Sequence, residues 1–143
     1  MNQTKVFQAY NDESGIGNED RYTSISVISG EKEILNCLRE KLAQEISQKR
    51  VKEVKFVKVT SYKSIIAQAA KTFIYSVIND FAIFKKLRID TITVDTQYLI
   101  STFPDYDKGQ KLEHMYYCLL AHIVRQWNNA QWNFFPDANS KVN

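Results

Sequence analysis

Residues 6–15 read Val-Phe-Gln-Ala-Tyr-Asn-Asp-Glu-Ser-Gly, and they lead the chain from an apolar run directly into a turn. The apolar part predicts a short buried strand over Lys5–Asn11. Two carboxylates, Asp12 and Glu13, follow where this strand is expected to end. A strand end holds an acidic side chain in a defined direction, which suits metal-assisted chemistry. Asp, Ser and Gly are also the usual residues of a simple turn, so both interpretations stay open here.

The bulk composition is that of a globular chain. Its 143 residues suit one domain. Hydrophobic residues make up 44% and charged residues 24%, which are ordinary values for a folded soluble domain. With 4 glycines and 2 prolines, the chain can form few irregular loops. The net charge of +3 permits nucleic-acid binding only if the basic residues cluster.

The cysteines and the N-terminus bear on the cellular setting. Cys37 and Cys118 are far apart in the sequence and neither has a neighbouring cysteine, so the sequence indicates neither a zinc knuckle nor a redox pair. Free cysteines in apolar helical stretches favour a reducing compartment. The first residues contain no apolar signal region, and no apolar run approaches the length of a membrane span. We therefore expect a cytoplasmic protein that does not associate with membranes.

Hydrophobic periodicity predicts the element order β-β-α-β-α-β-α-β. The first helix should follow Gly30 and carry an apolar stripe to Ile46, and a turn should cover Phe103 to Gly109. The mixed order predicts an α/β fold: a mixed sheet flanked by helices in a single compact domain over residues 1–137, followed by a polar tail at 138–143. The other expected elements are strands at Lys5–Asn11, Tyr22–Ser29, Val54–Val59, Ile89–Val94 and Trp132–Phe135, and helices at Ser61–Phe84, expected to be the most buried, and Lys111–Trp127.

Four acidic residues fall at comparable places beside these strands. Asp12 and Asp95 follow the first strand and the Ile89 strand, Glu53 precedes the Val54 strand, and Asp137 follows the last strand. If the strands lie side by side, the four carboxylates would converge at one edge of the sheet. Converging carboxylates repel one another unless a cation holds them. Mg²⁺ and Mn²⁺ prefer oxygen ligands and suit such a cluster, whereas the alternative is a set of solvated loop acids.

Two other features suggest chemistry less strongly. His114 and His122 are eight positions apart on one predicted helix, which is not the i, i+4 spacing of a two-histidine metal site. We expect ordinary surface or partly buried histidines. An aromatic C-terminal segment favours contact with the core, a protein partner or a second copy over the stacking of bases; its residues are Trp127, Trp132, Phe134 and Phe135.

Three segments in order resemble one protein family. They are Asp12-Glu13-Ser14-Gly15, Glu53-Val54-Lys55-Phe56-Val57-Lys58 and Thr93-Val94-Asp95. Together they resemble the bacterial domain of unknown function numbered 3800, over most of the chain. The resemblance implies an RNase H-like fold in which acids of the central sheet and an adjoining element bind divalent metal. It also implies a nuclease-type hydrolase function.

Carried over onto this sequence, the resemblance assigns roles to individual residues. Asp12, Asp95 and Glu53 would be catalytic, with Asp12 and Asp95 as metal ligands for Mg²⁺ or Mn²⁺. Asp137 would be a further metal ligand. Lys55 and Lys58 would face the phosphate of the substrate. The leading hypothesis is therefore a metal-dependent nuclease, or a related phosphoryl-transfer enzyme, that acts on nucleic acid.

The alternative is a non-catalytic RNase H-like binding module, or a subunit of a larger assembly such as one in phage defence. Members of the family usually continue further beyond the position of Asp137, and this favours the alternative. The presence of Asp12, Glu53 and Asp95 favours the enzyme. The sequence leaves open whether the substrate is DNA or RNA, and which partner or oligomer the chain forms.

Overall fold

The computed structural model describes residues 5–15, 20–52, 54, 59, 61–82, 87–127 and 130–135, without the side chains of 80–82. Contacts within the chain divide it into two compact units, one formed by Met1–Gly30 with Arg88–Asn143 and the other by Glu31–Leu87. Most of the expected Val54–Val59 strand lies outside the described residues. So do four predicted site residues, which are Glu53, Lys55, Lys58 and Asp137.

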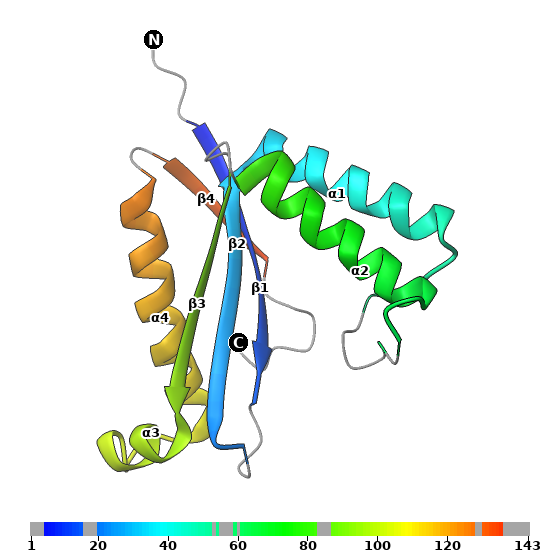
Figure 1. The fold of residues 1–143 in the computed structure, drawn as a ribbon. Helices are drawn as coiled ribbons and strands as arrows, with labels where there is room; N and C mark the ends of the chain where they lie inside the picture. Colours follow the sequence, from blue (N-terminus) through cyan, green and yellow to red (C-terminus); the bar gives the residue numbers. More distant parts are fainter. Residues whose placement is uncertain are drawn as a thin grey trace. The chain divides into compact units, whose positions relative to one another are not determined.

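The first unit is built on a mixed four-stranded sheet with the strand order β3-β2-β1-β4 (Figure 1). The seven residues between β1 and β2 are too few for a parallel crossover, so these strands are antiparallel. β1 and β4 pair in parallel. The expected mixed α/β architecture is confirmed at this level. The strands are β1 Lys5–Ser14, β2 Tyr22–Glu31, β3 Leu87–Asp95 and β4 Ala130–Phe135.

Side-chain hydrogen bonds give the direction of β3. Ser24 lies opposite Thr93, with 2.9 Å between their hydroxyl oxygens. Ser26 lies opposite Thr91 at 3.0 Å. From the first pair to the second, the residue number increases by two on β2 and decreases by two on β3. The two strands are therefore antiparallel. It follows that β1 and β3, on either side of β2, run in the same direction.

Two helices complete the first unit, α3 Thr96–Thr102 and α4 Lys108–Gln126. Asp107 caps α4: its carboxylate accepts from the Gln110 backbone N–H, while the Gln110 side chain accepts from the Asp107 N–H. The apolar face of α4 packs on one face of the sheet. The resulting core consists of Ala9, Ile25, Val27, Leu99, Leu112, Met115, Tyr116, Leu119 and Ile123.

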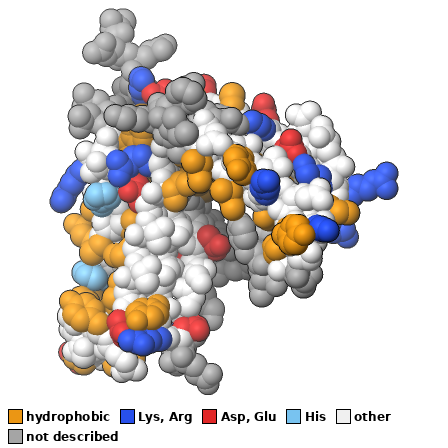
Figure 2. All heavy atoms as spheres, viewed as in Figure 1, with side chains coloured by type: hydrophobic (Ala, Val, Ile, Leu, Met, Phe, Trp, Pro, Cys, Tyr) orange, Lys and Arg blue, Asp and Glu red, His pale blue; other side chains and the backbone are white. Residues whose placement is uncertain are grey.

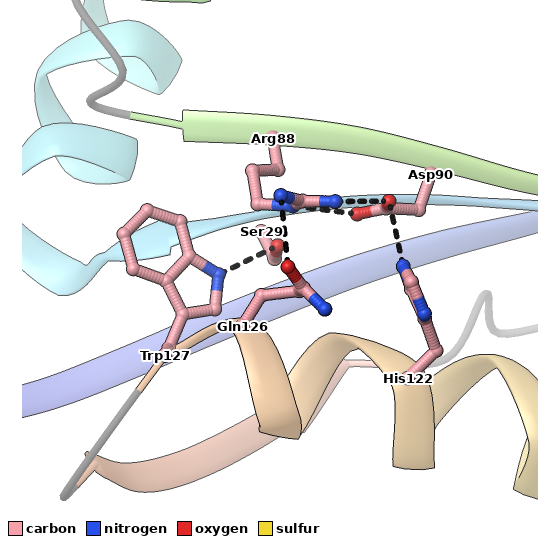
Figure 3. A network of polar contacts seen from close by, with 6 residues as sticks. All are labelled: Ser29, Arg88, Asp90, His122, Gln126 and Trp127. Carbon is pink, nitrogen blue, oxygen red and sulfur yellow. Dashed lines mark hydrogen bonds and ion pairs between the residues drawn. The ribbon is translucent and has the colours of Figure 1, made fainter.

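A polar network joins β3 to the end of α4 (Figure 3). Arg88 donates to Asp90 over 2.8 Å and to Gln126 over 3.4 Å. The Nε2 atom of His122 lies 3.6 Å from the same Asp90 carboxylate. The hydrogen bond from Arg88 to Asp90 raises the pKa of the guanidinium, although burial opposes the shift. The contacts of Arg88 with Gln126 and of Asp90 with His122 join β3 to α4, while the ion pair of Arg88 and Asp90 lies within β3.

The second unit contains α1 Lys32–Gln48, α2 Ile65–Tyr75 and the π-helical turn η2 Ser76–Ala82. Ser64 begins α2, because its hydroxyl accepts the Ala67 N–H. The helix thus begins later than the expected Ser61 and changes to π geometry at Ser76. The prediction that it is the most buried helix is wrong, because other residues cover only part of its apolar face and several of its apolar side chains are exposed. Its exposed side chains include Ile65, Phe73, Ile74 and Ile78.

Two further differences concern the site. β1 continues to Ser14 instead of ending at Asn11, so Asp12 and Glu13 are strand residues that point to opposite faces. The α3 helix, immediately after β3, is absent from the predicted order. Its seven residues are too few to show a helical period, and only the capping residue Asp95 marked its start.

Candidate functional site: an acidic sheet end beside a small pocket

Asp12 and Asp95 lie at the same end of the sheet. Both β1 and β3 run antiparallel to β2, so their carboxyl ends coincide. Asp12 is near the end of β1 and Asp95 is the last residue of β3. The two strands are not neighbours, because β2 lies between them. At the usual strand spacing their backbones are about 10 Å apart.

Strand alternation places both carboxylates on one face. Asn11 and Glu13 contact Tyr116 of α4, so Asp12 points to the opposite face of β1. On β3, Asp90 contacts α4, which assigns Asp95 to the opposite face in the same way. The two acids therefore share the face turned away from α4.

The same face carries the Ser24–Thr93 and Ser26–Thr91 hydroxyl pairs of β2 and β3. Figure 2 shows a largely white area over these strands, the colour of uncharged polar side chains and backbone, with charged side chains near the end that carries α3. Hydroxyls donate and accept hydrogen bonds without carrying charge. This face could therefore contact a sugar–phosphate chain between the acids.

The two acids differ in their contacts. Asp12 is exposed, and its Oδ1 atom accepts the Glu13 N–H over 2.9 Å. Asp95 caps α3 by accepting the Gln97 N–H over 2.9 Å. The other oxygen of Asp95 lies 3.7 Å from Nε of Arg21, a side chain that is 74% exposed. Asp95 thus has a structural role as a helix cap in addition to any role as a ligand.

A buried tyrosine holds the second acid of the motif. The Tyr116 hydroxyl donates to Glu13 over 2.5 Å and accepts from the Asn11 amide over 2.5 Å. Burial, and then the hydrogen bond to Glu13, raise the pKa of Tyr116 above its ordinary range. The hydroxyl therefore stays protonated at neutral pH and fixes the Glu13 carboxylate. Sequence reasoning missed this pair, because nothing in the sequence shows which helical residue faces Glu13.

Tyr116→Phe is expected to lower the free energy of unfolding by about 1–3 kcal/mol, since the Asn11 amide and Glu13 lose a buried partner. Urea unfolding at pH 7 measures this. Tyr117→Phe is the matched control: that ring is 72% exposed on the same helix, so the change should stay within about 0.5 kcal/mol.

The same pair predicts a pH dependence. Because the pKa of the Tyr116 hydroxyl is raised in the folded state, this tyrosine stabilises the fold below its unfolded pKa of about 10. The wild-type advantage should therefore shrink above that pH. Equal stability of Tyr116→Phe and wild type at pH 7 would contradict the assignment.

A hollow of about 310 Å³ opens beside this end of the sheet. Thr23 and Thr96 form one side of it, with their hydroxyl oxygens 3.4 Å apart. The Thr23 hydroxyl also donates a hydrogen bond to the Gly15 carbonyl over 2.8 Å. This bond links the hollow to the last residue of the motif Asp12-Glu13-Ser14-Gly15. The remaining lining comes from α3, α4 and the loop between them, and consists of Leu99, Ile100, Tyr106, Asp107, Lys108, Lys111, Leu112 and Met115.

The predicted metal cluster is only partly within the described structure. Glu53 and Asp137 lie outside the described residues, as do Lys55 and Lys58, so the predictions for these four stay predictions. Among the residues that the structure describes, no group of three or more His, Cys, Asp or Glu side chains is arranged to hold a metal ion. Asp12 and Asp95 are the two predicted ligands whose positions are known.

The histidines and the aromatic segment have packing contacts. His114 lies against Phe103, with 4.7 Å between ring centroids, and His122 contacts Asp90. Trp127 and Trp132 pack on Phe7. In the aromatic C-terminal segment, Phe134 and Phe135 are each 40% exposed. A protein contact through this segment would therefore rest on those two rings.

Comparisons with known proteins add no identification. No protein-family model matches the sequence, no curated protein matches it, and no solved structure matches the fold. In the described parts of the chain, no helix is both long enough and apolar enough to cross a membrane.

Proposed function

We propose that this protein is a divalent-metal-dependent nuclease, or a related phosphoryl-transfer enzyme, that acts on nucleic acid and has an RNase H-like fold. The observation that carries the proposal is the placement of Asp12 and Asp95 at one end and on one face of a mixed sheet. The resemblance of the motif Asp12-Glu13-Ser14-Gly15 to the family numbered 3800 supports it.

The donor set fits a hard divalent cation. Mg²⁺ is commonly bound by one or two carboxylates together with waters and substrate phosphate, and Mn²⁺ accepts the same oxygen ligands. Asp12 and Asp95 would hold the metal, with Glu53 and Asp137 as further proposed ligands. When bound, such an ion activates a water molecule and stabilises the leaving oxygen of a phosphodiester.

Other side chains of this chain would position the substrate. Arg21 lies beside Asp95 with an exposed guanidinium that suits a phosphate oxygen. The hydroxyls on β2 and β3 lie along the same face as the acids. Glu13, whose carboxylate accepts a hydrogen bond from the Tyr116 hydroxyl, adds negative charge on the other side of β1. Lys55 and Lys58 are proposed to contact further phosphates.

A cleavage assay tests this function. Wild-type protein is incubated with end-labelled single-stranded DNA, duplex DNA and single-stranded RNA, in Mn²⁺, in Mg²⁺ or in EDTA. We expect shortened products only with metal. Asp95→Asn should lose cleavage but keep its fold, because asparagine caps a helix as well as aspartate does. Asp105→Asn, an exposed acid before α4, is the control and should retain cleavage. Products in EDTA, or no product with any substrate, would contradict the proposal.

The second candidate is a non-catalytic RNase H-like binding module that serves a larger assembly. It is favoured by the engagement of Asp95, whose carboxylate already caps α3 and pairs with Arg21. For such a module, nucleic acid would bind without being cut. Neither wild type nor Asp95→Asn would then respond to Mn²⁺ in a thermal unfolding experiment.

A further inference from the structure

We propose that the hollow between α3, α4 and the ends of β2 and β3 holds one nucleotide of a bound single strand. Its phosphate would contact Lys108 and Lys111, and its base would lie on the apolar floor. This inference rests on the proposed function and deepens it, since it names the substrate class and a subsite outside the acidic residues.

The size and lining of the hollow suit one nucleotide. At about 310 Å³ it lies at the lower end of the roughly 300–1,000 Å³ typical of small-ligand sites. Apolar side chains of Leu99, Leu112 and Met115 line its floor. A flat base buries its faces against such a surface. The hydroxyls of Thr23 and Thr96 supply a polar side that can bond a sugar or a base edge.

The charge of the hollow favours an anion. Lys108 is exposed at the first position of α4, and Lys111 lies one turn further along. The Lys111 ammonium donates to the Tyr106 carbonyl over 2.6 Å, which holds it beside the hollow. The Asp107 carboxylate partly offsets the two positive charges. Its Oδ1 atom accepts the Gln110 N–H, as the cap of α4. Cations at the positive end of a helix repel the helix dipole, and a phosphate between them would relieve this repulsion.

The hollow is also in the right place for a strand that reaches the acids. Thr96 directly follows Asp95 in the sequence, and its N–H donates to the Arg21 carbonyl over 2.9 Å. Thr23 is bonded to Gly15 at the end of the acidic motif. The hollow and the acidic face thus share the same end of the sheet. The acids lie on the face turned away from α4, so a flexible single strand with one nucleotide in the hollow would pass around this end of the sheet to reach them.

Binding in the absence of cleavage tests the inference. The probe is fluorescein-labelled decathymidylate, its anisotropy is measured in EDTA, and the salt concentration is varied. Each lost phosphate contact should reduce the slope of log K against log salt by about 0.7 for a single strand. Both lysines contact the same phosphate, so Lys108→Gln/Lys111→Gln should reduce the slope by about 0.7 and weaken binding roughly tenfold at low salt.

A matched double variant controls for the loss of charge. Lys32→Gln/Lys63→Gln removes two lysines that do not line the hollow, and Lys32 occupies the first position of α1 as Lys108 does in α4. Its slope and affinity should stay near those of wild type. An equal loss in both double variants would overturn the subsite, because binding would then follow net charge alone.

A competition experiment tests whether the base binds on the apolar floor of the hollow. Adenosine monophosphate and ribose 5-phosphate carry the same phosphate, but only the first carries a base. Adenosine monophosphate should displace the probe roughly tenfold better, in line with the usual energy of base stacking. Equal competition would overturn the part of the inference that concerns the base.

The outcomes also separate this inference from the proposed function. If the lysine variants lose binding as expected but wild type cuts nothing in Mn²⁺, the subsite stands as a nucleic-acid site and the nuclease proposal fails. If the salt slope is unchanged in Lys108→Gln/Lys111→Gln, the subsite is wrong, whatever the cleavage assay shows.

Discussion

Asp12→Asn is expected to reduce metal-dependent cleavage of nucleic acid at least about 100-fold while leaving the fold intact. Asparagine keeps the shape of the side chain and an oxygen that can accept the Glu13 N–H, as Asp12 does now. It lacks the negative charge that a hard divalent cation requires. Loss of a ligand lowers metal affinity, so both binding and turnover should fall.

Thermal unfolding gives a readout that does not depend on substrate. Metal at about 100 times its dissociation constant should stabilise wild type by about 2.7 kcal/mol. For a chain of this size, that corresponds to a rise in Tm of roughly 5–11 °C. Asp12→Asn should show little rise with Mn²⁺, while Asp105→Asn should respond like wild type. A wild-type Tm that does not change in millimolar Mn²⁺ would favour the binding module over the enzyme.

Gly15→Ala is expected to lower the free energy of unfolding by about 3 kcal/mol or more. This loss is larger than the one expected for Tyr116→Phe. Gly15 has φ of +70°, a region that other residues rarely adopt. A Cβ atom there would lie 2.0 Å from the Tyr22 carbonyl oxygen and 3.1 Å from its carbon. Both are backbone atoms of β2, so the strand itself would have to move.

Urea or thermal unfolding of Gly15→Ala measures the effect, and Tm should fall by roughly 6–12 °C. Gly109→Ala is the matched control, because Gly109 lies in the first turn of α4. Its added Cβ would meet only the Asp107 side chain, at 3.2 Å. Alanine favours a helix over glycine, so the change should stay within about 1 kcal/mol. A Gly15→Ala protein as stable as Gly109→Ala would show that the turn adapts.

Gly15 also shows how a motif can carry two roles. In the sequence, Ser14-Gly15 allowed either a turn or part of a functional strand end. In the structure, Gly15 directly follows β1 with a φ of +70°, while Asp12 and Glu13 lie within β1. The positive φ that favours glycine and the two carboxylates therefore belong to different residues of the same motif.

Local patterns in the sequence were sufficient for most elements. Alternating β-branched residues predicted β2 and β3, and apolar spacing predicted α1 and α4, because strand and helix periods are set by neighbours within one or two turns. The patterns failed for α3, which is too short, and for the start and end of the helix that follows Ser64.

The sequence by itself determined that acids lie near the ends of two apolar strands, at Asp12 and Asp95, and that the fold mixes strands with helices. Only the tertiary structure decided that β2 separates these acids and that Tyr116 holds Glu13. It also brought Lys108 and Lys111 beside the ends of β2 and β3. Strand order and helix docking depend on the burial of apolar surfaces from segments far apart in the chain, and no local period encodes that choice.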